Sequence, residues 1–251
     1  MRIVEATWER RNLGCEAFEV SLTRGDFVDM GSVISRLDER RYADAFVTVK
    51  LPVGNLSAVH RLEDEGFRFV ETQFQIGYDL SQYRCPPAVA DFVSPVVQVE
   101  VPKNLQDWKC VADLITPDLF ETDRIALDPC FGTDVGCVRY KNWLLDLVTD
   151  TDAHLYVFHL PDNQDDLLGF TLTREIGKVS HAVLGGVFAH CKIPGVGVSI
   201  WNQYLKNSES RGFVRIETAV SSNNPAVLIM DSVLGYVIEK MTYVMRRNKI
   251  H

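Results

Sequence analysis

Three apolar runs separated by very short spacers constrain the fold of this chain more than any other feature. The runs cover residues 153–160, 167–176 and 179–189 and are rich in β-branched, aromatic and leucine residues. Their spacers, 161–166 and 177–178, contain turn-forming residues and are too short for the crossover that parallel neighbours require. The middle of the chain is therefore predicted to form an antiparallel meander.

Strand and helix patterns flank the meander on both sides. The predicted strands are 96–101, 213–220 and 236–247, and the predicted helices are 104–115, 138–148 and 224–234. Three prolines within residues 83–95 predict a linker, because proline interrupts both helices and sheet ladders. We interpret the chain as an α/β (α+β) protein with a smaller amino-terminal domain, residues 1–92 including the linker, and a larger domain, residues 93–251.

The two predicted domains share a local pattern. Asn55 precedes Gly66 by the same interval as Asn224 precedes Gly235, and an aromatic residue follows each glycine. Asparagine caps helices and glycine ends them, so capped helices before strands explain the pattern by chance. A partial internal duplication explains it equally well.

Composition excludes several classes of protein. The net charge is −8 and no basic run occurs, which argues against nucleic acid as the main partner. No apolar stretch reaches the roughly 18 residues of a membrane span, and no signal peptide is recognisable, so a cytoplasmic protein without a membrane partner is expected. Six scattered cysteines without a C-x-x-C pair predict neither a metal site nor a disulfide framework.

The segment after the meander, Lys192-Ile193-Pro194-Gly195-Val196-Gly197, admits three interpretations. The glycines could give a tight connection from strand to helix. The segment could be a dinucleotide-binding fingerprint, but that motif needs a third glycine and position 200 is isoleucine. The start of a helix could instead hold a phosphate through its free N–H groups. Gly185 and Gly186 in the preceding strand favour the last interpretation, since they suit the close approach of a thin ligand such as coenzyme A.

This segment resembles the acyl-CoA signature of the GNAT acetyltransferases, Arg/Gln-x-x-Gly-x-Gly/Ala. The stretch "NNPAVLIMDSVLGY", residues 223–236, is similar to the later Asn-Ala-helix-Gly-aromatic segment of that family. The resemblance implies a GNAT fold over residues 93–251, with a mixed, mostly antiparallel central sheet flanked by helices. It also implies that the amino-terminal domain is a partial GNAT repeat.

The resemblance implies a set of residues that bind acyl-CoA. They are Val187, Phe188, Lys192, Ile193, Gly195, Val196, Gly197, Val198 and Asn224. Amide groups around Val187 and Phe188 would polarise the thioester carbonyl. Two positions depart from the signature, because Lys192 replaces the planar Arg or Gln and Pro194 has no N–H to donate.

The family often has a tyrosine, seven residues after the asparagine, that protonates the departing thiol. Here that position is Asp231. Burial would raise its pKa and let it donate a proton, whereas a solvated Asp231 would be ionised. We take Asp231 and His181 as the catalytic candidates, with His154 and His190 as other possible bases. A lone histidine is more often an ordinary surface or core residue, and this is the alternative for each of the three.

The acceptor is expected to meet residues 128–143, which look like a loop because of their Gly and Asp content. Arg139, Tyr140 and Trp143 are the candidate substrate-binding residues, and packing into the core is the alternative for Trp143 and Arg139.

The segments "RYKNWLLDLV", "DLLGFTLTRE" and "LEDEGFRFVETQF" are similar to the GNAT N-acyltransferases of dTDP-linked amino-dideoxysugars. This resemblance implies transfer of an acetyl or 3-hydroxybutyryl group from acyl-CoA to a 3- or 4-amino group, in the biosynthesis of a surface sugar such as O-antigen, other lipopolysaccharide or capsule. A homodimer is also implied. Another amine acceptor (a peptide, polyamine or aminoglycoside) and a catalytically silent acyl-CoA-binding module are the alternatives.

Overall fold

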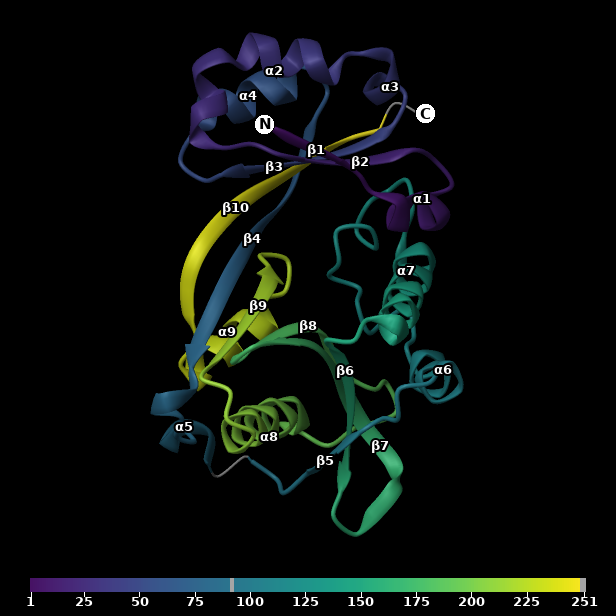
Figure 1. The fold of residues 1–251 in the computed structure, drawn as a ribbon, viewed down its shortest axis with the longest axis vertical. Helices are drawn as coiled ribbons and strands as arrows, with labels where there is room; N and C mark the ends of the chain where they lie inside the picture. The colour runs from purple at the N-terminus through teal and green to yellow at the C-terminus, as the bar shows by residue number, and fades with distance from the viewer. Residues whose placement is uncertain (91–92, 249–251) are drawn as a thin grey trace. The chain divides into compact units, whose positions relative to one another are not determined.

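The computed structural model describes residues 1–90 and 93–248, without the side chains of Gln82 and Ala88. The chain forms two compact units, which are described separately here (Figure 1). The first contains Met1–Phe74, Ser221–Asn223 and the chain from Lys240 onward, and the second contains Gln75–Val220 and Asn224–Glu239. The predicted domain boundary after residue 92 lies outside the described residues.

The first unit is a small sheet with helices packed on it. Its elements are β1 (Arg2–Glu5), α1 (Thr7–Leu13), β2 (Ala17–Ser21), α2 (Met30–Leu37), α3 (Arg40–Ala43), β3 (Phe46–Pro52), α4 (Leu56–Asp64), and parts of β4 (Arg68–Asp79) and β10 (Val237–Arg247). The strand order is β1-β2-β3-β10, in which only β2 and β3 are parallel. The strand, helix and strand pattern predicted around Asn55 is present.

Apolar faces of α2 and α4 close the core of the first unit. Leu37 and Leu62 from these helices pack with Val47 and Val49 of β3. Arg247 of β10 is also buried, and its guanidinium donates hydrogen bonds to the carbonyls of Leu37 and Glu65 at the ends of the two helices. A cation at the carboxyl end of a helix is favourable, so Arg247 fixes both helices to the sheet.

The second unit has a mixed sheet that confirms the predicted architecture. Its elements are the rest of β4, α5 (Pro87–Ala90), β5 (Val97–Glu100), α6 (Leu105–Asp113), α7 (Thr133–Asp146), β6 (Ala153–Leu160), β7 (Asn163–Ile176), β8 (Val179–Val187), α8 (Val196–Ser210), β9 (Arg215–Ser221), α9 (Pro225–Leu234) and the start of β10. The order is β4-β9-β8-β7-β6-β5, with β5 to β8 antiparallel and β8 parallel to β9. Helix α8 covers one face, and α6 and α7 cover the other (Figure 1).

The starts of α7 and β7 differ most from the predicted boundaries. Helix α7 begins at Thr133, so most of the expected loop at 128–143 is helical. Cys137 and Leu144 of this helix are buried in the core. Their packing stabilises a helix here, although the glycine and aspartate content of the stretch suggested a loop. Strand β7 begins at Asn163, so only two residues lie between β6 and β7. The polar residues that suggested a longer spacer form the exposed end of this hairpin instead.

A bulge in β8 changes what this strand can pair with. Leu184 lies opposite Leu172 and Ala182 lies opposite Thr173, so Val183 is an extra residue in the ladder. On its other side β8 pairs with β9 only from Val179 to Ala182. A bulge bends its strand, and beyond Ala182 the β9-facing edge of β8 therefore has no strand partner in the described sheet.

Gly169 of β7 allows the close approach of strand and helix next to this edge. A Cβ placed there would overlap the carbonyl oxygen of Gly186 and would lie 2.8 Å from Ile200 Cδ1 of α8. The Gly186 carbonyl oxygen belongs to the backbone, so an added methyl group at position 169 would fit only if β8 moved.

We expect Gly169→Ala to lower the free energy of unfolding by about 2 kcal/mol, as overpacking of a core does. Chemical denaturation measures this change. Gly25→Ala is the control, since its Cβ would meet only Thr23 Oγ1 at 3.6 Å. Equal stability of the two variants would contradict this account of Gly169.

Candidate functional site

The turn between β8 and α8 exposes backbone donors at the start of a helix. Gly195 is the residue before α8 and has φ 73°, a left-handed conformation that favours glycine. The N–H groups of Gly197 and Val198, in the first turn, have no hydrogen-bond acceptor among the described residues. Two free donors at the positive end of a 15-residue helix form a binding position for an anion.

Gly197 has no structural reason to be glycine within the protein. Its φ is not positive, and a Cβ there would meet only Val187 Cγ2 at 3.6 Å, an ordinary contact. Glycine weakens a helix by about 1 kcal/mol relative to alanine. Its main effect here is to leave the surface beside the free amides open, which suits a ligand.

The remaining residues of the turn have different environments. Lys192 is exposed, and its charge acts on Asp118. Ile193 accepts a hydrogen bond from the Val196 amide at 3.3 Å, so that amide is already used. Val196 itself is buried. Of the six residues predicted in this turn, Gly197 and Val198 therefore provide the free donors and Lys192 the nearby cation.

The unpaired edge of β8 exposes the backbone N–H of Val187 but not that of Phe188. The Phe188 N–H donates to the Leu168 carbonyl at 2.9 Å, and its side chain is fully buried against Phe170. The prediction that the Phe188 amide polarises a thioester is therefore wrong. Because successive residues of a strand alternate, the Val187 N–H points to the opposite edge, away from β7.

The paired glycines of β8 are explained by side chains of the protein. A Cβ at Gly185 would lie 3.2 Å from Trp201 Cζ3, and a Cβ at Gly186 would lie 3.0 Å from Leu119 Cδ1. Both glycines thus make room for neighbouring residues, and the sequence-based argument that they accommodate a ligand directly is not needed.

Asp231 is buried in the last part of α9. Its side chain is 1% exposed, and neither carboxyl oxygen has a hydrogen-bond partner among the described residues. Burial raises the pKa of Asp231 to about 7, while the nearby Trp201 indole acts in the opposite direction. The solvated alternative is wrong, and a large fraction of this carboxyl group is protonated at neutral pH.

Two residues that sequence reasoning missed lie next to Asp231. Trp201 Nε1 and the Tyr236 hydroxyl are buried and also lack partners in the described structure. The Trp201 indole influences the pKa of both Asp231 and Tyr236, so it lies beside both groups, although it falls short of hydrogen-bond geometry with either. The aromatic residue after Gly235 was a visible signal for Tyr236, whereas nothing in the sequence marked Trp201.

The three candidate histidines are each held by other groups. His181 Nδ1 lies 3.4 Å from Glu217 of β9, and His190 Nε2 lies 2.8 Å from the Leu167 carbonyl. His154 lies between two carboxylates, 2.7 Å from Glu100 and 3.6 Å from Glu175. None of them hydrogen-bonds to Asp231, whose oxygens have no partner in the described structure.

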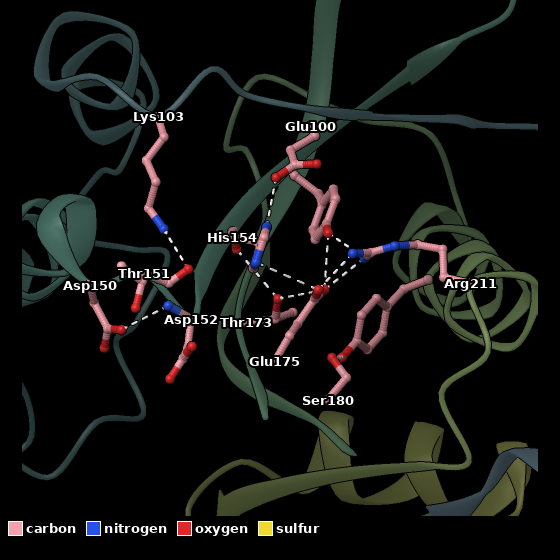
Figure 2. A network of polar contacts seen from close by, with 12 residues as sticks. Glu100, Lys103, Asp150, Thr151, Asp152, His154, Thr173, Glu175, Ser180 and Arg211 are labelled. Carbon is pink, nitrogen blue, oxygen red and sulfur yellow. Dashed lines mark hydrogen bonds and ion pairs between the residues drawn. The ribbon is translucent and has the colours of Figure 1, made fainter. Parts of the chain in front are cut away.

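The polar network around His154 has a structural role (Figure 2). Arg211, just after α8, forms two hydrogen bonds with Glu175 of β7 at 2.7 and 2.6 Å. Tyr156 donates to the same carboxylate at 2.9 Å. Charge-assisted pairs of this kind are strong, and the network fixes the end of α8 to β6 and β7.

The predicted acceptor residues form an internal cluster. Arg139 is buried and lies 3.5 Å from Asp123, and Tyr140 donates to the same carboxylate at 2.8 Å. Tyr140 also stacks on Phe120 at 3.9 Å. These contacts support the packing alternative for Arg139 but not for Trp143, which remains 37% exposed, and they place Tyr140 in the same internal cluster.

Asn224 acts as a helix cap. Its Oδ1 accepts a hydrogen bond from the Val227 N–H at 3.2 Å, and Asn55 does the same for Ala58 at 3.1 Å. Gly66 and Gly235 both have positive φ, as helix-ending glycines do. The repeated pattern therefore has one local geometry at both places.

Comparison with known proteins gives a fold but no sequence relative. No family model matches the chain, and no curated protein matches it. A GCN5-related N-acetyltransferase from Sphaerobacter thermophilus is similar in structure, with a TM-score of 0.62 and 16% identity over 98% of this chain and 75% of that chain.

Two further solved structures support the same fold. One is a GCN5-related N-acetyltransferase from Kribbella flavida, with a TM-score of 0.57 and 15% identity over 92% of this chain and 81% of that one. The other is a tandem GNAT protein from the clavulanic acid pathway, with a TM-score of 0.54 and 12% identity over 89% and 70% of the two chains. The chain has a GNAT-like α/β fold, and a tandem relative fits the description as two domains.

The described residues contain neither a membrane-spanning helix nor a cluster of metal ligands. No helix there has the length and apolar character that crossing a bilayer requires. No group of three or more metal-ligating side chains is present in the same part of the chain.

The raised pKa of Asp231 predicts a pH-dependent stability. The folded protein binds a proton up to about pH 7, whereas the unfolded carboxyl loses it near 3.8. Stability therefore falls as pH rises between these values, by up to about 4 kcal/mol, and is constant above them. We expect Asp231→Asn, which cannot ionise, to remove this part of the decline.

Denaturation of both proteins in steps from about pH 5 to about pH 8 measures the difference. Asp165→Asn is the matched control, because Asp165 is exposed in the β7 hairpin. If wild type and Asp231→Asn show parallel stability curves, Asp231 is not a buried acid with a raised pKa.

Proposed function

We propose that this protein is an acyl-CoA-dependent N-acyltransferase. The observation that carries the proposal is the pair of free amides at Gly197 and Val198, next to the open edge of β8, in a GNAT-like fold. These amides would bind the diphosphate of coenzyme A. Lys192 would add a cation beside them.

The pantetheine arm would lie along β8. It is peptide-like, and an extended chain can add to an unpaired strand edge through backbone hydrogen bonds. Beyond Ala182 the β9-facing edge of β8 is such an edge, and it includes Val187. The acyl-CoA would therefore run from the first turn of α8 toward the middle of the sheet.

Transfer would proceed by direct attack of an amine on the thioester. The nitrogen lone pair forms the new C–N bond, and the tetrahedral intermediate then breaks its C–S bond with the electron pair going to sulfur. Asp231, protonated near neutral pH because it is buried, would give its proton to the thiolate. The amine's own proton would leave through water, with His181, which is 37% exposed, as the proposed base.

The acceptor that the sequence resemblance implies is the amine of a dTDP-linked amino-dideoxysugar, with acetyl or 3-hydroxybutyryl as the acyl group. Arg139 and Tyr140 do not support it, because Asp123 holds both. Trp143 keeps an exposed ring that could stack on a sugar or base. The amino sugar is the first acceptor to test because the resemblance implies it. A homodimer remains an expectation of the same resemblance, and a cytoplasmic location remains an expectation from the sequence pattern.

The free amides predict opposite effects of Gly197→Ala on stability and on binding. The methyl group makes only an ordinary contact, so stability should rise by about 0.5 kcal/mol, as for glycine to alanine at a compatible position. It would also occupy the space beside the amides, and we expect the affinity for coenzyme A to fall at least about tenfold. Calorimetry and denaturation measure the two quantities.

Gly31→Ala is the matched control for this experiment. Gly31 is the second residue of α2, as Gly197 is of α8, and its Cβ would meet only Asp29 Oδ1 at 3.4 Å. This variant should gain similar stability with unchanged affinity. Coenzyme A binding that is unaffected by Gly197→Ala would locate the ligand elsewhere.

Thiol release from acetyl-CoA with a panel of amines tests the activity itself. Thiol release that depends on dTDP-amino sugars supports the sugar acceptor. Release only with polyamines, peptides or aminoglycosides supports the alternative, an acyltransferase that acts on another amine. Binding without release would identify a silent module. In an active enzyme, wild-type turnover should fall above about pH 7 as Asp231 loses its proton, and Asp231→Asn should lack that decline.

A further inference from the structure

Four buried polar atoms in the second unit meet without partners. They are both carboxyl oxygens of Asp231, Nε1 of Trp201 and the hydroxyl of Tyr236. Leaving one such group unsatisfied costs about 1–3 kcal/mol, and native proteins rarely tolerate several in one place. Their convergence from α8, α9 and the second residue after α9 indicates a position built for a group that arrives from outside.

The Trp201 indole lies between this cluster and the proposed path of acyl-CoA. Its Cζ3 approaches Gly185, where an added Cβ would be 3.2 Å away, in the stretch of β8 that β9 does not pair. Its other end carries the N–H beside Asp231 and Tyr236. Trp201 is half-buried, whereas Asp231 and Tyr236 are buried, so its ring is the part of the cluster nearest to solvent.

We propose that Trp201, Asp231 and Tyr236 form the site that receives the sulfur atom of the departing thiol, and that the Trp201 indole turns away from Gly185 to admit it. The proposal rests on the proposed function. It adds two residues to the reaction and assigns a movement to one of them.

The three groups supply what a thiolate leaving group requires. When the C–S bond breaks, its electron pair stays on sulfur, and the Trp201 N–H and Tyr236 O–H donate hydrogen bonds to that charge. Asp231 transfers its proton to the sulfur and becomes a carboxylate. The proton lost by the attacking amine passes through His181 and water to Asp231. The thiol therefore carries the proton that Asp231 held at the start, Asp231 is protonated again, and the charges balance.

The titratable groups beside the cluster add no further charge to it. Tyr204 of α8 and Tyr78 of β4 are the titratable groups beside Tyr236, and burial raises the pKa of both. Both are therefore neutral at physiological pH. Apart from Asp231 itself, the cluster thus has only neutral neighbours, and its donors remain available to a new negative charge.

Tryptophan fluorescence during a coenzyme A titration tests the movement. We expect the emission of the wild-type protein to change on binding, since the Trp201 environment changes. The change should be lost in Trp201→Phe and kept in Trp143→Phe, whose tryptophan is on α7. Calorimetry on each variant would show that coenzyme A still binds. A signal that persists unchanged in Trp201→Phe overturns the proposed movement.

Tyr236→Phe tests the contact with sulfur. Removal of one hydroxyl that acts only on the leaving group should lower thiol release by about 10 to 100-fold while the affinity for coenzyme A changes little. It should also move the high-pH decline of turnover, which a purely structural residue would leave in place. Wild-type release by Tyr236→Phe would overturn the sulfur site.

The outcomes separate this inference from the function on which it rests. If the wild-type protein shows neither heat with coenzyme A nor thiol release with any amine, both the proposed function and the sulfur site are wrong. If binding and turnover occur but Trp201→Phe and Tyr236→Phe behave like wild type, only the sulfur site is wrong.

Discussion

The early separation of β8 from β9 is the constraint on which the rest of the candidate site depends. Four residue pairs join these parallel strands, and the extra residue Val183 then bends β8 away. The separation leaves a backbone edge unpaired within the second unit, and such an edge invites aggregation unless something covers it. In this fold the edge leads directly to the free amides of α8, so one distortion of the sheet and one helix start place an unpaired strand edge next to free backbone donors.

The buried position of Asp231 is unfavourable for the stability of the fold. Helix α9 is mostly apolar, yet its buried residues are Leu234 and a carboxyl group, while Ile229 and Val233 are exposed. Optimising stability alone would reverse this pattern, because burial of an unpartnered acid is unfavourable. Active sites accept such arrangements when they need a group with a shifted pKa. The unpartnered Trp201 and Tyr236 show the same conflict.

The regular parts of the fold could be predicted from the sequence, because local patterns determine them. The meander, the strands and helices downstream of it, and the caps at Asn55 and Asn224 all follow from periodicity and capping chemistry. The start of α7 could not be predicted from the sequence. The composition of that stretch suggests a loop, whereas the packing of Cys137 and Leu144 in the core stabilises a helix. The role of Arg139 was similarly hidden, because its partner Asp123 is distant enough in sequence to form no local motif. Trp201 could not be predicted either, because its importance arises only where three elements meet.

Three strands contribute residues to both units: β4 and β10 divide after Phe74 and after Glu239, and Ser221, the last residue of β9, belongs to the first unit. The unit with the GNAT-like sheet is therefore discontinuous in sequence. A fragment that begins at the proline-rich segment would lack β4, the neighbour of β9, and would leave that sheet with a new unpaired edge. A single cut in the chain therefore does not separate the two units, and an excised or fused segment must take the shared strands into account.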